Sequence, residues 1–308
     1  MKVYRSLEAF VPPEWPVVTI GTFDGVHVGH RRIIEQLNQL AEKRGGESVV
    51  LTFHPHPRMV LHHELDLKLI NTLSERLELL ESVGVDHCIV HPFSVEFSRL
   101  SARDYVRDIL VSKLSVRSLV IGYDHHFGRN REGDYKVLEE YGGIYEFELE
   151  EISPQVLGDV KVSSTKIRAA LDAGDIALAN EYLQSPFMLG GYVVSGDQLG
   201  RTIGFPTANI RLSSPNKIIP SNGVYAVKVH LDEHLYHGMM NIGVRPTVKE
   251  SERTIEVHLI GYSGDLYGRM IGIEMHHRLR NEMKFGSVDQ LRDQIIKDKH
   301  EALAFFGA

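Results

Sequence analysis

The chain has 308 residues, of which 43% are hydrophobic and 24% charged, and its formal net charge is −7. This length predicts two domains with a core each, and the composition is that of a soluble globular protein. The negative charge argues against nucleic-acid and membrane partners, because both require a basic face.

The single cysteine, Cys88, lies in the apolar run 87–90 and is expected in a buried strand. One cysteine allows no disulfide within the chain, which fits a reducing compartment. The sequence also shows no signal peptide and no apolar run of bilayer-spanning length. We therefore expect a cytoplasmic protein.

The first strong pattern covers residues 17–30. The β-branched run 17–20 predicts a buried strand, and the loop Gly21–His30 leads from it into a helix over 31–44. The start of a helix is a natural phosphate seat, and the glycines allow close backbone approach. His27 and His30 stand at that seat, where imidazole can stabilise charge on a phosphate during transfer.

Two alternatives apply to this loop. It could be an ordinary Gly/Asp turn, or the two histidines could bind a metal, although no carboxylate stands nearby at ligand spacing. The loop is neither a G-x-G-x-x-G nor a Walker A sequence. It resembles the H-x-G-H signature of the nucleotidyltransferase superfamily.

Strands and helices then alternate. Strands are predicted over 48–53, 86–90 and 118–121, and helices over 72–83 and 101–114. This rhythm predicts a parallel, doubly wound, Rossmann-like sheet.

Polar loops follow three of the strands. Residues 54–57 read His-Pro-His-Pro and residues 122–130 read Gly-Tyr-Asp-His-His-Phe-Gly-Arg-Asn. Together with Gly21–His30, these loops can line one pocket at the carboxyl edge of the sheet. On local grounds, the proline segment is equally well explained as a rigid loop with exposed histidines.

A basic segment follows at residues 162–168. Its hydroxyl residues can cap a helix, and Lys166 and Arg168 can clamp a polyphosphate. The alternative is an N-cap with solvated basic residues. The run Ser-Ser-Thr-x-Ile-Arg resembles the mobile Lys/Arg segment of the nucleotidyltransferases.

The pattern changes after a short helix at 175–183 and the sequence Gln-Ser-Pro at 184–186, so we place a boundary between domains 1–184 and 185–308. Short β-rich runs without helices between them predict a small antiparallel Greek-key barrel, closed by a helix over 287–306. The runs are 189–194, 223–230, 236–242, 254–260 and 270–276.

Two barrel motifs carry chemistry. In the run 200–209, the Thr207 hydroxyl and the Asn209 amide oxygen suit Mg²⁺ with bound phosphates. In the run 254–259, alternation places Glu256 opposite the core face. Glu256 is then either a solvated strand residue or a base that accepts the proton of an alcohol attacking phosphorus.

The ordered set of motifs resembles the family of bifunctional bacterial FAD synthetases, which join a riboflavin kinase to an FMN adenylyltransferase. The motifs are Gly21–His30, Ser163–Arg168, Gly204–Asn209 and Asn241–Thr247. The resemblance implies that ATP phosphorylates riboflavin to FMN in the barrel. A second ATP then adenylylates FMN in the α/β domain, which yields FAD and pyrophosphate.

The resemblance also implies roles for individual residues. Catalysis falls to His27, His30 and Glu256. The residues implied to bind ATP in adenylyl transfer are Gly21, Phe23, Asp24, His27, His30, Ser164, Thr165, Lys166 and Arg168. Those implied to bind the flavin in the same reaction are Pro55, Pro57, Asp124 and Asp175. In the kinase, the residues implied to bind ATP are Gly200, Gly204, Thr207 and Asn209. Thr207 and Asn209 are also implied to bind Mg²⁺, and Val288 and Asp289 to bind the flavin.

The chain departs from the family pattern at two places. Asp124 and His125 stand where the family often has Asn and Phe, and an acceptor-only Asp cannot donate as Asn does. Lys166 replaces a frequent Arg, which keeps the charge without the bidentate geometry.

Two other functions compete with this one. The first is a monofunctional nucleotidyltransferase whose barrel only binds flavin, and the second is a flavin-binding or regulatory module without catalysis. The expected partners are the small-molecule substrates, with apo-flavoproteins as possible recipients of the product.

Overall fold

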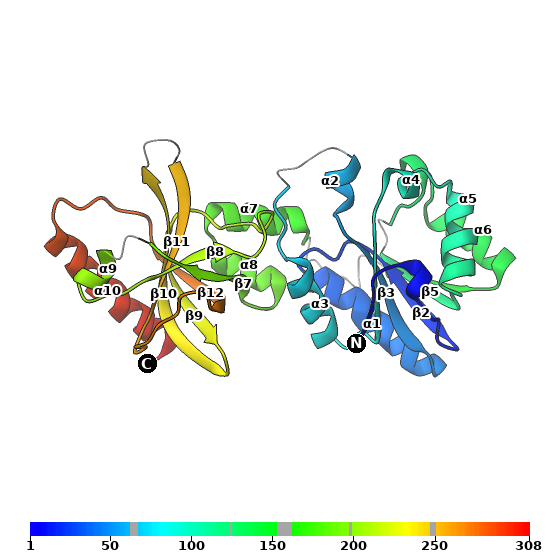
Figure 1. Ribbon diagram of the computed structural model, residues 1–308. Helices are drawn as coiled ribbons and strands as arrows, with labels where there is room; N and C mark the ends of the chain where they lie inside the picture. Colours follow the sequence, from blue (N-terminus) through cyan, green and yellow to red (C-terminus); the bar gives the residue numbers. More distant parts are fainter. Residues whose placement is uncertain (62–66, 123–124, 153–161, 197–198, 247–250) are drawn as a thin grey trace. The chain divides into compact units, whose positions relative to one another are not determined.

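A computed structural model describes residues 1–61, 67–122, 125–152, 162–196, 199–246 and 251–308. The chain divides into two compact units, Met1–Ser164 and Thr165–Ala308 (Figure 1). Asp124, a predicted site residue, and Thr247, the end of a predicted motif, lie outside the described residues.

The first unit is built on a parallel sheet. Among the described residues its strands run in the order β1 (Lys2–Tyr4), β4 (His87–His91), β3 (Glu47–Phe53), β2 (Pro16–Ile20), β5 (Ser118–Gly122) and β6 (Glu148–Ile152). Every neighbouring pair is parallel. The main helices are α1 (Val28–Arg44), α3 (Leu73–Ser82), η2 (Tyr105–Lys113) and α6 (Tyr135–Tyr145).

Helices cover both faces of this sheet. Successive strand residues point to opposite faces. Val17 therefore packs in one core with α1 and α3, whereas Val18 packs in a second core with η2 and α6. The predicted doubly wound parallel sheet is confirmed.

Two strands escaped prediction, and both lie at the edges of the sheet. β1 has three residues, and β6 reads Glu-Leu-Glu-Glu-Ile. An edge strand pairs on one side only and exposes polar side chains, so its sequence lacks the apolar run of a central strand. The helix expected over 101–114 is observed as α5 (Ala102–Asp104) continuing into η2, which has π-type hydrogen bonding.

The second unit contains a closed antiparallel barrel. Its strands are β7 (Phe187–Val194), β8 (Ala208–Leu212), β9 (Gly223–Leu231), β10 (His234–Pro246), β11 (Ser251–Leu259) and β12 (Met270–Arg280). They close in the order β10-β11-β8-β7-β12-β9. The helix α10 (Val288–Phe306) packs on β10, β9 and β12, as Figure 1 shows at the red end of the chain.

Two barrel details differ from the sequence expectation. β8 was not predicted, because Gly, Pro and Asn around it read as a loop. The expected absence of helices between the barrel strands was wrong, since the one-turn helix α9 (Leu199–Thr202) lies between β7 and β8. Its turn is held by hydrogen bonds from the N–H groups of Ile203 and Phe205 to the Gly200 carbonyl.

Two helices precede the barrel: α7 (Ser164–Ala173) and α8 (Ile176–Leu183). α8 packs against β12 and β7. The side chain of Asn180 reinforces this packing, since its amide donates to the Met275 carbonyl at 2.8 Å and accepts from the Phe187 N–H at 2.8 Å. The compact unit that holds the barrel therefore includes both helices.

Candidate active sites

The first candidate site is the loop between β2 and α1. His27 is the N-cap of α1, and its Nδ1 accepts a hydrogen bond from the backbone N–H of His30 at 3.4 Å. The two imidazole rings stack with centroids 3.7 Å apart, and the Phe23 ring meets His30 edge-on at 5.1 Å. The predicted pair is thus brought together at the helix start.

Both histidines are neutral near pH 7. Burial lowers the pKa of His27 to about 4, and the nearby Asp24 carboxylate only partly offsets this. Burial, followed by the neighbouring His27 and Arg76, holds the pKa of His30 well below its usual value. A neutral His27 that accepts at Nδ1 must carry its proton on Nε2.

Asp24 is fully buried and organises the backbone around this loop. Its carboxylate accepts hydrogen bonds from the N–H groups of Ile70 at 3.0 Å and Asn71 at 3.2 Å. Its carbonyl accepts from the Ser164 hydroxyl at 2.9 Å. Ser164, a predicted phosphate ligand, is therefore held against the histidine loop.

Arg76 is a buried cation beside this site that sequence reasoning missed. Only 1% of its surface is exposed, and its Nη1 donates to Thr52 Oγ1 and to the Phe53 carbonyl, both at 3.3 Å. Thr52 in turn donates to the Thr22 carbonyl in the histidine loop. The available signal was an arginine inside the apolar stripe of Leu73, Leu77 and Leu80.

The proline segment leaves the end of β3. Pro55 is exposed, and Pro57 begins α2 (Pro57–Leu61). Beside it, the ring of Phe53 at the end of β3 clusters with those of Phe93 and Phe97, which follow β4, with centroids 5.4–5.8 Å apart. Phe93 meets the other two rings edge-on, whereas Phe53 and Phe97 are tilted. These rings were not identified from the sequence.

Other predicted residues of this site lie in the second unit. Thr165, Lys166 and Arg168 follow Ser164 in α7. Asp175 is the N-cap of α8, and its carboxylate accepts from the Leu178 N–H at 3.0 Å. Their part in adenylyl transfer stays a prediction.

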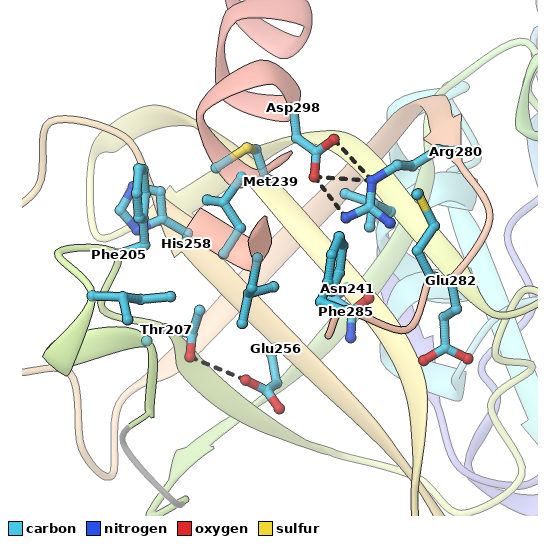
Figure 2. A pocket seen from close by; sticks show the side chains of 16 residues that line it. Phe205, Thr207, Met239, Asn241, Glu256, His258, Arg280, Glu282, Phe285 and Asp298 are labelled. Carbon is cyan, nitrogen blue, oxygen red and sulfur yellow. Dashed lines mark hydrogen bonds and ion pairs between the residues drawn. The ribbon is translucent and has the colours of Figure 1, made fainter. Parts of the chain in front are cut away.

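The second candidate site is a cavity of about 360 Å³ in the barrel unit (Figure 2). Its volume is in the range of small-molecule pockets. Nine of the sixteen lining residues are apolar, and seven are polar or charged. The lining residues are Gly200, Ile203, Phe205, Thr207, Val224, Met239, Asn241, Glu256, His258, Arg280, Glu282, Met283, Phe285, Leu291, Ile295 and Asp298.

Glu256 and Thr207 meet in this cavity. The Thr207 hydroxyl donates to Glu256 Oε2 at 3.1 Å, and Figure 2 shows this contact. The pairing of β8 with β11 places Asn209 directly opposite Glu256. The three predicted polar residues of the barrel are thus neighbours, although Asn209 is not among the lining residues.

The two predicted glycines shape the loop before β8. A Cβ on Gly200 would lie 2.3 Å from the Phe205 carbonyl oxygen, and Gly204 has a φ of +86°. Both positions therefore require glycine, one for close approach and the other for left-handed backbone.

Thr207 also lines a second cavity, of about 650 Å³. It is lined by the turn 262–267 and by Arg201, Pro206 and Leu259, among others. Since Thr207 lines both cavities, they meet beside Glu256.

The predicted flavin residues Val288 and Asp289 lie at the start of α10. Val288 is 54% exposed, and neither Val288 nor Asp289 is among the residues lining the two cavities. The next turns of the helix reach the first cavity through Leu291, Ile295 and Asp298.

An ion pair fixes α10 over that cavity. Arg280 Nε and Nη2 donate to the Asp298 carboxylate at 2.9 and 2.8 Å, and Asp298 is 2% exposed. Gln294 adds a third donor to the same carboxylate at 2.9 Å. Sequence reasoning did not identify this pair, because its members lie on different elements.

The described residues contain no group of three or more His, Cys, Asp or Glu side chains that could hold a metal ion. Nor does any helix described in the structure combine the length and the apolar character needed to cross a membrane.

Comparison with known proteins gives two family matches. Residues 12–166 match the family described as FAD synthetase, and residues 183–306 match the family described as riboflavin kinase. The bifunctional riboflavin kinase/FMN adenylyltransferase of Escherichia coli (strain K12) is 40% identical over 310 residues, which cover 100% of this chain and 98% of that protein. The protein so described from Bacillus subtilis (strain 168) is 38% identical over 296 residues, which cover 94% and 92%.

A solved structure shares the fold over nearly the whole chain. It is the crystal structure described as that of a macrolide-efflux protein from Streptococcus pneumoniae, with a TM-score of 0.88 and 32% identity. The match covers 97% of each chain.

The histidine pair predicts acid sensitivity of the first unit. The unfolded chain takes up protons on these histidines below their usual pKa of 6.5, whereas folded His27 does so only near 4. The free energy of unfolding is therefore highest above pH 6.5 and decreases as the pH falls towards 4. The slope is up to about 1.4 kcal/mol per pH unit for one group.

Urea unfolding at pH 5, 6 and 7 measures this slope. The only tryptophan, Trp15, lies in this unit and reports its unfolding by fluorescence. We expect His27→Asn, which preserves the N-cap, to reduce the loss between pH 6.5 and 5, and the exposed control His126→Asn to leave it unchanged. Equal slopes in all three proteins would contradict the assignment.

Proposed function

The chain belongs to the family of bifunctional riboflavin kinase/FMN adenylyltransferases, and on that basis we propose which of its residues carry the two reactions. As a riboflavin kinase it phosphorylates riboflavin with ATP to give FMN. As an FMN adenylyltransferase it joins FMN to the AMP part of ATP, which yields FAD and pyrophosphate. The observation that carries the proposal is the contact between Thr207 and Glu256 where two cavities meet.

The first cavity is the proposed flavin site of the kinase. An isoalloxazine ring is flat and aromatic, and Phe205, Met239 and Phe285 offer apolar surfaces on which such a ring can pack. The polar ribityl chain then extends towards Glu256. Val288 and Asp289 stay candidates for the outer edge of this site.

The second cavity is the proposed ATP site of the kinase. It adjoins Thr207 and the loop of Gly200 and Gly204, so ATP bound there would place its terminal phosphate near the flavin cavity. The hydroxyl of Thr207 and the amide oxygen of Asn209 are hard donors that fit Mg²⁺. Bound Mg²⁺ would neutralise charge on the transferring phosphate.

Glu256 is the proposed base of phosphoryl transfer. It accepts a hydrogen bond from Thr207, and it lines the cavity in which the ribityl hydroxyl would lie. Glu256 would accept the hydroxyl proton as the oxygen attacks the γ-phosphorus.

His27 and His30 are the proposed transition-state stabilisers of adenylyl transfer. The tautomer of His27, with its proton on Nε2, supplies a donor to an oxygen of the α-phosphate. A neutral donor suits this task because its hydrogen bond strengthens as negative charge develops on the phosphate oxygen. Gly21, Phe23 and Asp24 would shape the same phosphate seat.

The triphosphate and the flavin of this second reaction are assigned by resemblance. Ser164, Thr165, Lys166 and Arg168 would hold the β- and γ-phosphates. The flavin side comprises Pro55, Pro57 and Asp175, together with Asp124. The aromatic cluster beside Pro55 supports a flat aromatic ligand there.

We also propose residues 1–184 for adenylyl transfer and 185–308 for the kinase. The cytoplasm is the proposed location, which fits the single buried cysteine. Apo-flavoproteins are proposed as downstream recipients of the FMN and FAD.

Separate variants test the two sites. Riboflavin and Mg-ATP are supplied to the whole protein, and FMN and FAD are separated by chromatography. We expect Glu256→Gln to lower FMN formation by about 10²–10⁴-fold, since it removes a base. FAD formation from supplied FMN should persist in this variant.

The converse is expected for His27→Asn combined with His30→Asn, which should lower FAD formation by about 10²–10³-fold while FMN still forms. If wild type produced no FMN from riboflavin, the kinase half would fail. If each variant lost both steps, the two reactions would share one site.

The ion pair on α10 predicts a binding effect. Asp298→Asn removes one charge of a buried pair and so loosens α10 at the flavin cavity. We expect the KM for riboflavin to rise about tenfold, which corresponds to about 1.4 kcal/mol. Asp293→Asn, at an exposed position of the same helix, is the matched control and should leave the KM unchanged.

A further inference from the structure

His258 lies beside the proposed kinase base without a role so far. It stands on β11 two residues after Glu256, so both side chains point to the same face of the barrel. Both line the flavin cavity. Figure 2 shows the His258 ring next to that of Phe205, and the two meet edge-on at 5.5 Å.

The polar contact of His258 determines its tautomer. Its Nδ1 lies 2.8 Å from the Pro206 carbonyl oxygen. A carbonyl only accepts, so Nδ1 must carry a proton and donate it. Burial is the main cause that lowers the pKa of His258, with a smaller effect in the same direction from Lys299 on α10, and the Pro206 bond opposes both.

The accepting carbonyl belongs to the peptide group that joins Pro206 to Thr207. A hydrogen bond on that oxygen fixes the plane of the peptide, and the proline ring fixes φ at residue 206. Upstream, the same loop is tied by the bond from the Phe205 N–H to the Gly200 carbonyl at 2.8 Å. The His258 bond therefore fixes the loop at its last residue before Thr207.

We propose that His258 is a positioning residue for phosphoryl transfer, which ties the loop 200–207 to β11 and thereby sets the Thr207 hydroxyl against Glu256. The proposal rests on the kinase function proposed above. It assigns His258 no contact with substrate or phosphate. Its effect passes through the Pro206 carbonyl, one peptide group away from Thr207.

Two substitutions separate the hydrogen bond from the ring. His258→Asn keeps an N–H donor at the position of Nδ1 but removes the ring that packs on Phe205. His258→Phe keeps a ring and removes the donor. A purely structural role would depend on the ring, whereas the positioning role depends on the donor.

The measurement is the steady-state formation of FMN by the whole protein with riboflavin and Mg-ATP. We expect His258→Phe to lower kcat by about tenfold or more, because small misplacement of a reacting group costs rate steeply. The KM for riboflavin should stay within about threefold. His258→Asn should recover most of the lost kcat.

Three controls accompany the pair. FAD formation from supplied FMN should be unchanged in both variants, and riboflavin binding measured by calorimetry should persist, which shows an intact barrel. His230→Phe, at an exposed position of β9, makes the same exchange away from the cavity and should retain wild-type kcat.

Several outcomes would overturn the proposal: wild-type kcat in His258→Phe, equal losses in the Phe and Asn variants, or loss of riboflavin binding with loss of kcat. The Glu256→Gln variant separates this failure from failure of the kinase assignment. If Glu256→Gln kept full kinase activity, the proposed base would be wrong. If it lost activity while His258→Phe kept it, only the role of His258 would be wrong.

Discussion

The pairing of β8 with β11 is the constraint on which the barrel site depends. β8 is short, and it alone joins β7 to β11 and so closes the barrel. Its register sets Asn209 opposite Glu256 and leaves Thr207 at the strand entrance, where the two cavities meet. A shift of one residue would turn Asn209 to the other face and separate the polar groups. The pairing of β8 with β11 therefore both closes the barrel and brings the polar residues of the site together.

The first unit reaches a similar result by other means. Its site lies at the start of α1, where His27 is the N-cap of the helix. The surrounding residues are buried, and they include Arg76 and Asp24. Holding a cation in such a place costs free energy, and the adjacent loops provide the hydrogen bonds that offset part of this cost. Both sites thus rely on polar side chains fixed by backbone groups of neighbouring loops.

Much of this arrangement was predictable from the sequence. The central strands, the barrel strands and α1 from Arg31 onward carry strong local patterns, and the motifs at 204–209 and 254–259 mark the barrel site. The first turn of α1 and its cap at His27 were placed in the loop instead. The edge strand β6 escaped because it has polar residues, and β8 because its start lies within a Gly/Pro motif. His258 and the pair of Arg280 with Asp298 were not identified for another reason. Their partners lie on other elements, and local periodicity contains no information on such contacts.

The packing of α7 and α8 bears on how the polypeptide can be divided. Ile176, Ala179 and Leu183 of α8 are buried, and the helix lies against β7 and β12. Dividing the chain after residue 184 would separate α8 from the barrel and expose these apolar side chains. Dividing it after residue 164 would keep α8 packed on the barrel. Anyone who wishes to produce the barrel as a separate, well-behaved polypeptide should start it ahead of α7. The boundary proposed between the two catalytic functions, after residue 184, thus differs from the boundary between the two compact units, after residue 164.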